Sequence, residues 1–127
     1  MNGQPMEMMH MIRNVTLAFL VSLAVVVAPF ETAAAQSVPE AAVVKPLLAK
    51  GTCLACHAVD KKVVGPAYRD VAEKYKADAK TVDLLADKIL KGGSGVWGAV
   101  PMPPAAGISS AEAKILATWV LAGAPAN

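Results

Sequence analysis

The sequence of 127 residues lacks a strong charge bias: its formal net charge is +2, and it contains no long run of like charges. Proteins that bind nucleic acid usually carry a basic patch or stripe, so the composition does not support nucleic acid as a partner. A long hydrophobic run is also missing. The uncharged stretch at residues 14–30 contains Thr16, Ser22 and Pro29, and a membrane-spanning helix needs about 20 predominantly apolar residues. This stretch is therefore short for a membrane anchor.

The first 35 residues have the order of parts typical of a secretory signal peptide. Arg13 precedes the apolar stretch, and three alanines ending at Ala35 follow it as a small-residue cleavage site. We expect cleavage after Ala35, which divides the chain into a signal peptide at 1–35 and an exported domain at 36–127. An uncleaved anchor is the alternative. The residues before Met11 fit a signal peptide poorly, so translation starts at either Met1 or Met11.

Sulfur and imidazole side chains are scarce after residue 35, where Cys53, Cys56, His57 and Met102 are the only cysteines, histidine and methionine. A structural zinc site needs four ligands, and no second cluster is present. A thioredoxin-like redox pair is expected beside a βαβ pattern, which this sequence does not show. A structural disulfide between Cys53 and Cys56, which are separated by only two residues, is less favoured than the redox pair. The spacing favours haem attachment, in which both thiols add to haem vinyl groups and the adjacent imidazole binds the iron.

The sixth ligand of such an iron decides its function. A thioether there raises the reduction potential and suits electron transfer, whereas an open position suits oxygen chemistry or ligand sensing. Met102 offers the only thioether, and it lies between Pro101 and Pro103. Prolines reduce the freedom of the unfolded loop, so holding the sulfur in one place costs less entropy. We therefore expect Met102 to bind the iron rather than to fill a gap in the core.

Four segments together resemble a known family. CLACH at 53–57, VGPAYRDVAEKY at 64–75, GVWGAVPMPP at 95–104 and AKILATWVLAG at 113–123 look like a small bacterial class I monohaem cytochrome c of the cytochrome c-551 type. Many cytochromes share the haem attachment motif, whereas the segment at 97–104 is specific to this short type. The resemblance implies an all-α fold in which about four short helices surround one covalently attached haem c.

The resemblance also implies how the iron is held. Cys53 and Cys56 match the cysteines that form thioethers, His57 matches the proximal ligand and Met102 the distal ligand. Pro66 matches the proline whose carbonyl accepts a hydrogen bond from Nδ1 of the proximal histidine. Such an acceptor fixes the tautomer and leaves Nε2 for the iron.

Two further positions match residues that contact the haem propionates in the family. Trp97 matches a tryptophan that donates its indole N–H, and Lys88 falls where a basic side chain pairs with the same groups. The alternative for Trp97 is a core aromatic, because buried indoles need a partner for their N–H in any case. One position departs from the family: Ala105 stands where an asparagine often hydrogen-bonds near the methionine sulfur.

Local patterns predict the first two helices. Ser37 and Glu40 have capping-box spacing for a first helix, and Pro46 is expected to bend or interrupt it, because proline removes a helical hydrogen bond. A short second helix is expected at residues 67–75.

Capping residues also predict the last two helices. Thr81 is expected to cap the third, which ends at Gly92. Ser109 and Glu112 have the capping-box spacing of the fourth, which reaches Gly123. We expect the first and last helices to cross and bury their apolar faces against each other.

An iron with both axial positions filled, and no nucleophile or acid–base pair near the motifs, suits a monomeric single-electron carrier rather than an enzyme. By resemblance, this carrier works in the periplasm between a cytochrome-reducing complex and a nitrite reductase or cytochrome oxidase. The lysines expected around an exposed haem edge are Lys50, Lys61, Lys62, Lys88 and Lys91.

Two alternatives remain open. One is a haem enzyme, or a gas- or peroxide-responsive haem, from which Met102 dissociates. The other is a membrane-tethered cytochrome subunit of a larger oxidoreductase. Because so small a domain has few large aliphatic side chains in its last two helices, we also expect the haem-free chain to be largely unfolded.

Overall fold

The computed structural model describes residues 37–126, and all structural statements below concern them. The elements follow in the order α2 (Ala41–Lys50), the short 3-10 helix η1 (Cys53–Ala55), α3 (Tyr68–Tyr75), α4 (Ala79–Lys91) and α5 (Ser110–Leu121). Within these residues the only β pairing is two isolated bridges, so the predicted all-α class is confirmed. The predicted signal peptide at 1–35 and its cleavage site lie outside the described residues. No helix in the described part is long and apolar enough to cross a membrane.

Helix α5 begins as the sequence predicts. The Ser109 hydroxyl accepts a hydrogen bond from the Glu112 backbone N–H at 3.3 Å, and the Glu112 carboxylate accepts one from the Ser109 N–H at 2.8 Å. This reciprocal capping box satisfies two N–H groups that the start of a helix leaves without partners.

The predicted cap of α4 is wrong by three residues. Asp78 is the N-cap, and its carboxylate accepts the backbone N–H of Thr81 at 2.8 Å. Thr81 itself lies inside the first turn and is buried. Aspartate and threonine are both good caps. Because α4 buries Val82 and Leu85, the helix begins at Ala79, and Asp78 is therefore the residue at the N-cap position. The helix ends before Gly92, as predicted.

Helix α2 also differs from expectation. Its N-cap is Glu40, no side chain caps it, and the predicted Ser37 capping box is absent because the chain at Glu40 is still extended. Pro46 lies inside the helix without interrupting it. A proline there removes the hydrogen bond to the Ala42 carbonyl and crowds that carbonyl, but the burial of Val44 and Leu48 on one face holds the turns together.

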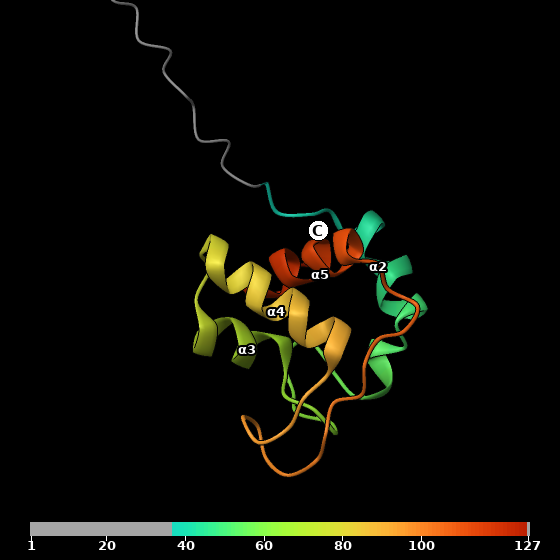
Figure 1. Cartoon of the computed structure of the whole chain (residues 1–127). Helices are drawn as coiled ribbons and strands as arrows, with labels where there is room; N and C mark the ends of the chain where they lie inside the picture. Colours follow the sequence, from blue (N-terminus) through green and yellow to red (C-terminus); the bar gives the residue numbers. More distant parts are fainter. Residues whose placement is uncertain (1–36, 127) are drawn as a thin grey trace, which may run out of the picture. The chain divides into compact units, whose positions relative to one another are not determined.

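Helix α5 is the centre of the core, and it packs against α2, α3 and α4 (Figure 1). Ala113 and Ala117, four residues apart on α5, are completely buried, and Leu116 between them is almost so. Small side chains on one face let neighbouring helices approach closely while Leu116 fills the space between them. The predicted contact between the first and last helices is confirmed.

The segment between α4 and α5 leaves this core. In Figure 1 it is the orange loop that extends away from the helices before it returns to α5. Gly93 and Met102 pair across its base through two hydrogen bonds of 3.0 and 2.8 Å. From 94 to 101 every residue is exposed, and the backbone there makes one hydrogen bond, from Gly95 N–H to the Gly98 carbonyl.

Candidate functional site

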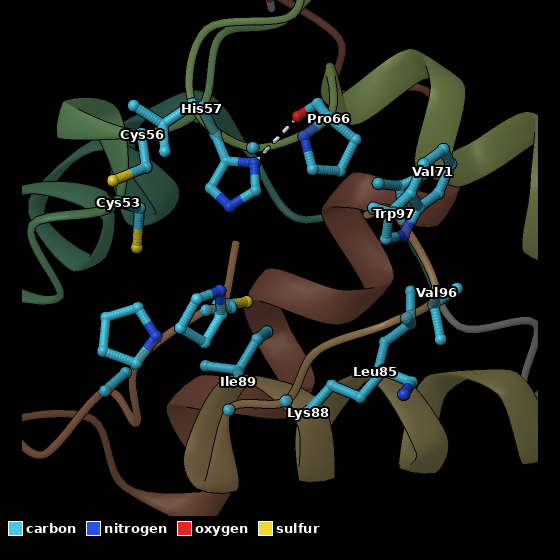
Figure 2. A pocket seen from close by; sticks show the side chains of 18 of the residues that line it. Cys53, Cys56, His57, Pro66, Val71, Leu85, Lys88, Ile89, Val96 and Trp97 are labelled. Atoms are coloured by element: carbon cyan, nitrogen blue, oxygen red, sulfur yellow. Dashed lines mark hydrogen bonds between the residues drawn. The ribbon is translucent and has the colours of Figure 1, made fainter. Parts of the chain in front are cut away.

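A single turn gathers the two cysteines and the histidine. The backbone N–H groups of Cys56 and His57 both donate to the Cys53 carbonyl, at 3.2 and 3.0 Å. Thr52 enters this turn with φ of 52°, a left-handed conformation that reverses the chain after α2. Residues three and four apart on a helical turn share one face. Both thiols and the imidazole therefore face one cavity (Figure 2).

The ring of His57 is held in one orientation. Its Nδ1 lies 2.8 Å from the Pro66 carbonyl oxygen, an acceptor only, so Nδ1 carries the proton and donates it. Figure 2 shows this bond as a dashed line. A Cβ on Gly65 would lie 2.8 Å from Nδ1 and 2.9 Å from Nε2 of His57. Only glycine leaves room for the ring at that place, and among the described residues His57 has no hydrogen bond through Nε2.

Tyr68 supports the other side of the imidazole. Its ring stacks on His57 with centroids 5.3 Å apart and 19° between the planes, and Trp119 meets Tyr68 edge-on at 5.4 Å. The Tyr68 hydroxyl is buried without a hydrogen-bond partner among the described residues. Burial, and after it the neighbouring charges of Cys53 and Cys56 when ionised, raise the pKa of Tyr68, so the phenol stays neutral.

Tyr68 is a site residue that was not predicted from the sequence. Its spacing to Val71 and Tyr75, three and seven residues later, is that of one helix face and could have identified it.

The two thiols are free, because no disulfide joins Cys53 and Cys56. Burial raises the pKa of the Cys53 thiol, and a hydrogen bond from its own backbone N–H offsets part of this rise. A thiol with a raised pKa is a poor nucleophile at neutral pH. Cys53 therefore lacks the lowered pKa that a thioredoxin-like redox pair uses.

The cavity has a volume of about 440 Å³, within the range of about 300–1,000 Å³ that is usual for small-molecule and cofactor sites. One side is formed by residues 51–68, which we call the cysteine wall. The other side includes residues 92–104, which we call the methionine wall, together with α4. Leu85, Lys88 and Ile89 project from α4 into the space below His57 (Figure 2).

All residues predicted for the site line this one cavity: Cys53, Cys56, His57, Pro66, Lys88, Trp97 and Met102. The fold thus brings together residues that are up to 49 positions apart in the sequence, from Cys53 to Met102.

Met102 is held through its backbone. It is partly buried, and its N–H and carbonyl both pair with Gly93 at the base of the loop. Gly92 makes this pairing possible, since its φ of +70° suits glycine and a Cβ there would collide with the Met102 carbonyl oxygen.

Trp97 lies near the tip of the methionine wall and does not belong to the core. The residue is 40% exposed, so in the described part of the chain Trp97 is not one of the buried core side chains. The ammonium of Lys74 lies 5.2 Å from the indole centroid, and the Tyr75 ring lies 6.5 Å away at 54°. Both contacts come from the end of α3.

A family model described as cytochrome c matches residues 42–123 of this chain. The chain belongs to the cytochrome c family. It is 61% identical over 69 residues to cytochrome c-552 of Hydrogenobacter thermophilus, covering 54% of this chain and 69% of the relative. Cytochrome c-551 of Allochromatium vinosum is 51% identical over 75 residues, which cover 59% of this chain and 80% of that protein.

A solved structure agrees with these matches. The crystal structure of cytochrome c552 from Nitrosomonas europaea is similar with a TM-score of 0.58 and 51% identity, and the match covers 61% of this chain and 95% of that one. The chain is therefore a small class I monohaem cytochrome c. Proteins of this family carry covalently attached haem c, and electron transfer is their function.

The residues around the cavity fit such a group. Two free thiols lie on the same turn as an imidazole whose Nδ1 is already used and whose Nε2 is available. The space that a side chain at position 65 would take is filled by the His57 ring, so glycine there keeps the imidazole in place at the cavity. The rest of the lining is largely apolar and includes Leu48, Leu85 and Leu116, as expected of a wall that packs against a large flat apolar group.

Proposed function

We propose that this cytochrome c is a periplasmic single-electron carrier whose haem c is bound through Cys53 and Cys56, with His57 and Met102 as the two axial ligands of the iron. One observation carries the proposal: a thioether and an imidazole with its Nε2 available line the same cavity as the two free thiols. The group, when bound, supplies an iron that alternates between its ferrous and ferric states by one electron.

His57 contributes a fixed and strengthened ligand. Nδ1–H donates a hydrogen bond to the Pro66 carbonyl, and this makes Nε2 more basic and holds the ring in place. Stacking on Tyr68 and the closeness of Gly65 prevent the ring from rotating. A ligand that does not move when the charge of the iron changes keeps the cost of each electron transfer low.

Met102 contributes a weak, neutral ligand that favours the reduced state and so raises the reduction potential. Its pairing with Gly93 opposes dissociation, which supports an electron carrier over a ligand-binding or peroxide-responsive haem. With His57 and Met102 both holding the group, no position would be left for a substrate, so the protein would act as a carrier and not as an enzyme.

Lys88 and Trp97 are proposed to face the propionates. Lys88 lies in the last turn of α4 and lines the cavity, and Trp97 lines it from the loop tip. A lysine ammonium and an indole N–H are both donors, and charge-assisted bonds to carboxylates are among the stronger ones. The charge of Lys88 would offset the negative charge of the propionates, and the indole of Trp97 would donate a hydrogen bond to them.

The partners are proposed to be a cytochrome-reducing complex on one side and a nitrite reductase or cytochrome oxidase on the other. Large apolar side chains are exposed in the cysteine wall and at the loop tip: Leu54, Val63, Val64, Val96 and Val100. A small apolar contact surface with charged side chains around it is typical of the transient complexes that redox proteins form. The exported domain is proposed to begin at Gln36, after removal of residues 1–35.

The lysines differ in their surroundings. Lys62 and Lys88 line the cavity, whereas Lys50 and Lys91 form salt bridges with Glu112 and Asp87. Lys61 and Lys62 are adjacent, exposed and outside the salt bridges of the described residues, so we expect these two lysines to contribute most to docking. The double variant Lys61→Glu and Lys62→Glu should slow electron transfer about tenfold at low salt, while Lys80→Glu, which does not line the cavity, should change it little. An unchanged rate in the double variant would remove these lysines from the docking surface.

The ligand assignment is tested by absorption spectra of the purified protein, oxidised and reduced, with and without carbon monoxide. The parent and a Val100→Ala control should show a weak far-red band in the oxidised state and no response to carbon monoxide. Met102→Ala should lose the band and bind carbon monoxide when reduced. A parent protein that binds carbon monoxide would contradict Met102 ligation and favour a catalytic or sensing haem.

The N-terminal residue of the purified protein tests the location. Gln36 at the N-terminus of a protein released with the periplasmic fraction is expected. A protein that keeps residues 14–30 and stays with the membrane fraction would favour the tethered subunit instead.

A further inference from the structure

The tip of the methionine wall is poorly held by its own backbone. Across residues 94–101 the described chain makes one backbone hydrogen bond, from Gly95 to Gly98, and the Gly93–Met102 pair closes only the base. Trp97, on this tip, is an exposed aromatic residue. A flexible tip would leave the indole N–H without a fixed direction, so something outside the loop must orient Trp97 if it is to face the cavity.

The end of α3 supplies that contact. The Lys74 ammonium lies 5.2 Å from the centroid of the indole ring, inside the distance of about 6 Å at which a cation is attracted to an aromatic face. Tryptophan is the best partner for such a contact. Among the described residues Lys74 forms no salt bridge, so no carboxylate competes with the ring for its charge.

The neighbouring residue completes the contact. The Tyr75 ring lies 6.5 Å from the indole and is tilted by 54°, a geometry that aromatic pairs favour. Successive residues on a helix point about 100° apart, so Lys74 and Tyr75 approach Trp97 from different directions. One contact limits rotation of the indole, and the other limits its movement away from α3.

From this geometry we infer that Lys74 is a positioning residue: its cation–π contact holds the Trp97 indole at the mouth of the cavity. The inference rests on the proposed function insofar as Trp97 is taken to face the propionates. The positive charge over the ring also polarises the indole and makes its N–H a better donor to a carboxylate. Lys74 thus acts on the bound group through Trp97, without touching it.

The test uses the haem-loaded protein labelled with 15N, in which the two tryptophans give two indole N–H signals. Trp119 serves as an internal reference, because its N–H is already donated to the Pro125 carbonyl at 3.1 Å. Trp97→Phe assigns the other signal. Lys74→Gln should shift the Trp97 signal and speed its hydrogen exchange by about twofold to fivefold, with no change at Trp119.

Two further variants separate this contact from a general effect of charge. Lys74→Arg keeps a cation that stacks on aromatic rings and should restore the parent signal and exchange rate. Lys76→Gln removes the same charge two residues away, at a side chain that is not placed over the Trp97 ring among the described residues, and should leave both signals unchanged. The inference is overturned if Lys74→Gln leaves the Trp97 signal unchanged, or if Lys76→Gln changes it equally.

The haem contact of Trp97 is judged separately, by the reduction potential of Trp97→Phe. A potential equal to that of the parent would contradict the proposed contact with the propionates. The indole signal of the Lys74 variants would still decide whether Lys74 orients Trp97.

Discussion

The two walls of the cavity are built differently. In the cysteine wall, hydrogen bonds connect successive turns: Cys56 and His57 bond to Cys53, Gly65 bonds back to Cys56, and Tyr68 bonds to Ala58. The methionine wall has the Gly93–Met102 pair at its base and little else in its backbone. The cysteine wall is therefore ordered by its own chain, whereas the methionine wall depends on contacts with α3, α4 and whatever fills the cavity.

Because of this difference, we expect the two walls to have different roles in binding the iron. The histidine side is rigid, and it fixes where the iron lies. The methionine side can adjust, and it decides whether the sixth position stays closed. We expect changes in the cysteine wall to alter stability most, and changes in the methionine wall to alter ligand binding most. The following predictions test that division, beginning with the largest effect.

Removal of the haem should affect both walls at once, because the haem occupies the space between them. The double variant Cys53→Ala and Cys56→Ala should lose most of its helical signal in far-UV circular dichroism, since a domain this small buries little apolar surface alone. The parent chain made without haem attachment is the control for the cysteine substitutions and should give the same spectrum. Native-like helicity in both would show that the walls form without the haem.

Gly65→Ala should be the most harmful single change in the cysteine wall. The added Cβ would press on the His57 ring, which Pro66 and Tyr68 hold from other sides, so strain cannot be relieved by rotation. We expect a loss of about 2–3 kcal/mol in urea unfolding. Gly107→Ala is the matched control, because its Cβ would meet only ordinary contacts at 3.6 and 3.9 Å. Equal stability of the two variants would contradict the rigid histidine side.

Gly92→Ala should act on the methionine wall. Alanine at φ of +70° is strained, and its Cβ would collide with the Met102 carbonyl, so the Gly93–Met102 pair should open. We expect about 1–2 kcal/mol of destabilisation together with carbon monoxide binding to the reduced protein. Ser94→Ala, two residues away in the same loop, should neither destabilise the protein nor allow carbon monoxide to bind. If Gly92→Ala lost stability but stayed closed to carbon monoxide, the backbone pair would not be what retains Met102.

The smallest effect concerns the ion pair that joins the end of α2, directly before the cysteine wall, to α5. The Lys50 ammonium lies 2.7 Å from Glu112, and this contact, followed by the hydrogen bonds with Ser109, lowers the pKa of Glu112 to about 2. A carboxyl group with a lowered folded-state pKa stabilises the fold above its unfolded value near 4.5, and this contribution is lost as the pH falls toward 2.

The measurement is the midpoint of thermal unfolding between pH 5 and pH 2. Glu112→Gln keeps a capping-box residue but has no charge to lose, so its midpoint should fall less over this range than that of the parent. If the unfolding midpoints of the parent and of Glu112→Gln fell by the same amount between pH 5 and pH 2, the Lys50–Glu112 pair would contribute nothing to the acid sensitivity.

Much of the site follows from local sequence. Cys53, Cys56 and His57 lie on one face because residues three and four apart on a turn always do, and this required no knowledge of the fold. The capping box of Ser109 and Glu112 is equally local. Asp78 and Thr81 are two possible N-caps within one turn, and local propensity was insufficient to choose between them. The start of α4 depends on which of its side chains are buried.

The sequence by itself determined the chemistry: two thiols beside an imidazole, one thioether between prolines, and four helices with an apolar face. The tertiary structure decided which of these residues meet. Packing of α2, α3 and α4 on α5 places Lys88 and the methionine wall across from His57, makes glycine necessary at position 65, and brings Tyr68 and Lys74 into contact with His57 and Trp97. These are contacts between distant segments, and their geometry depends on how whole helices pack, which local sequence patterns do not encode.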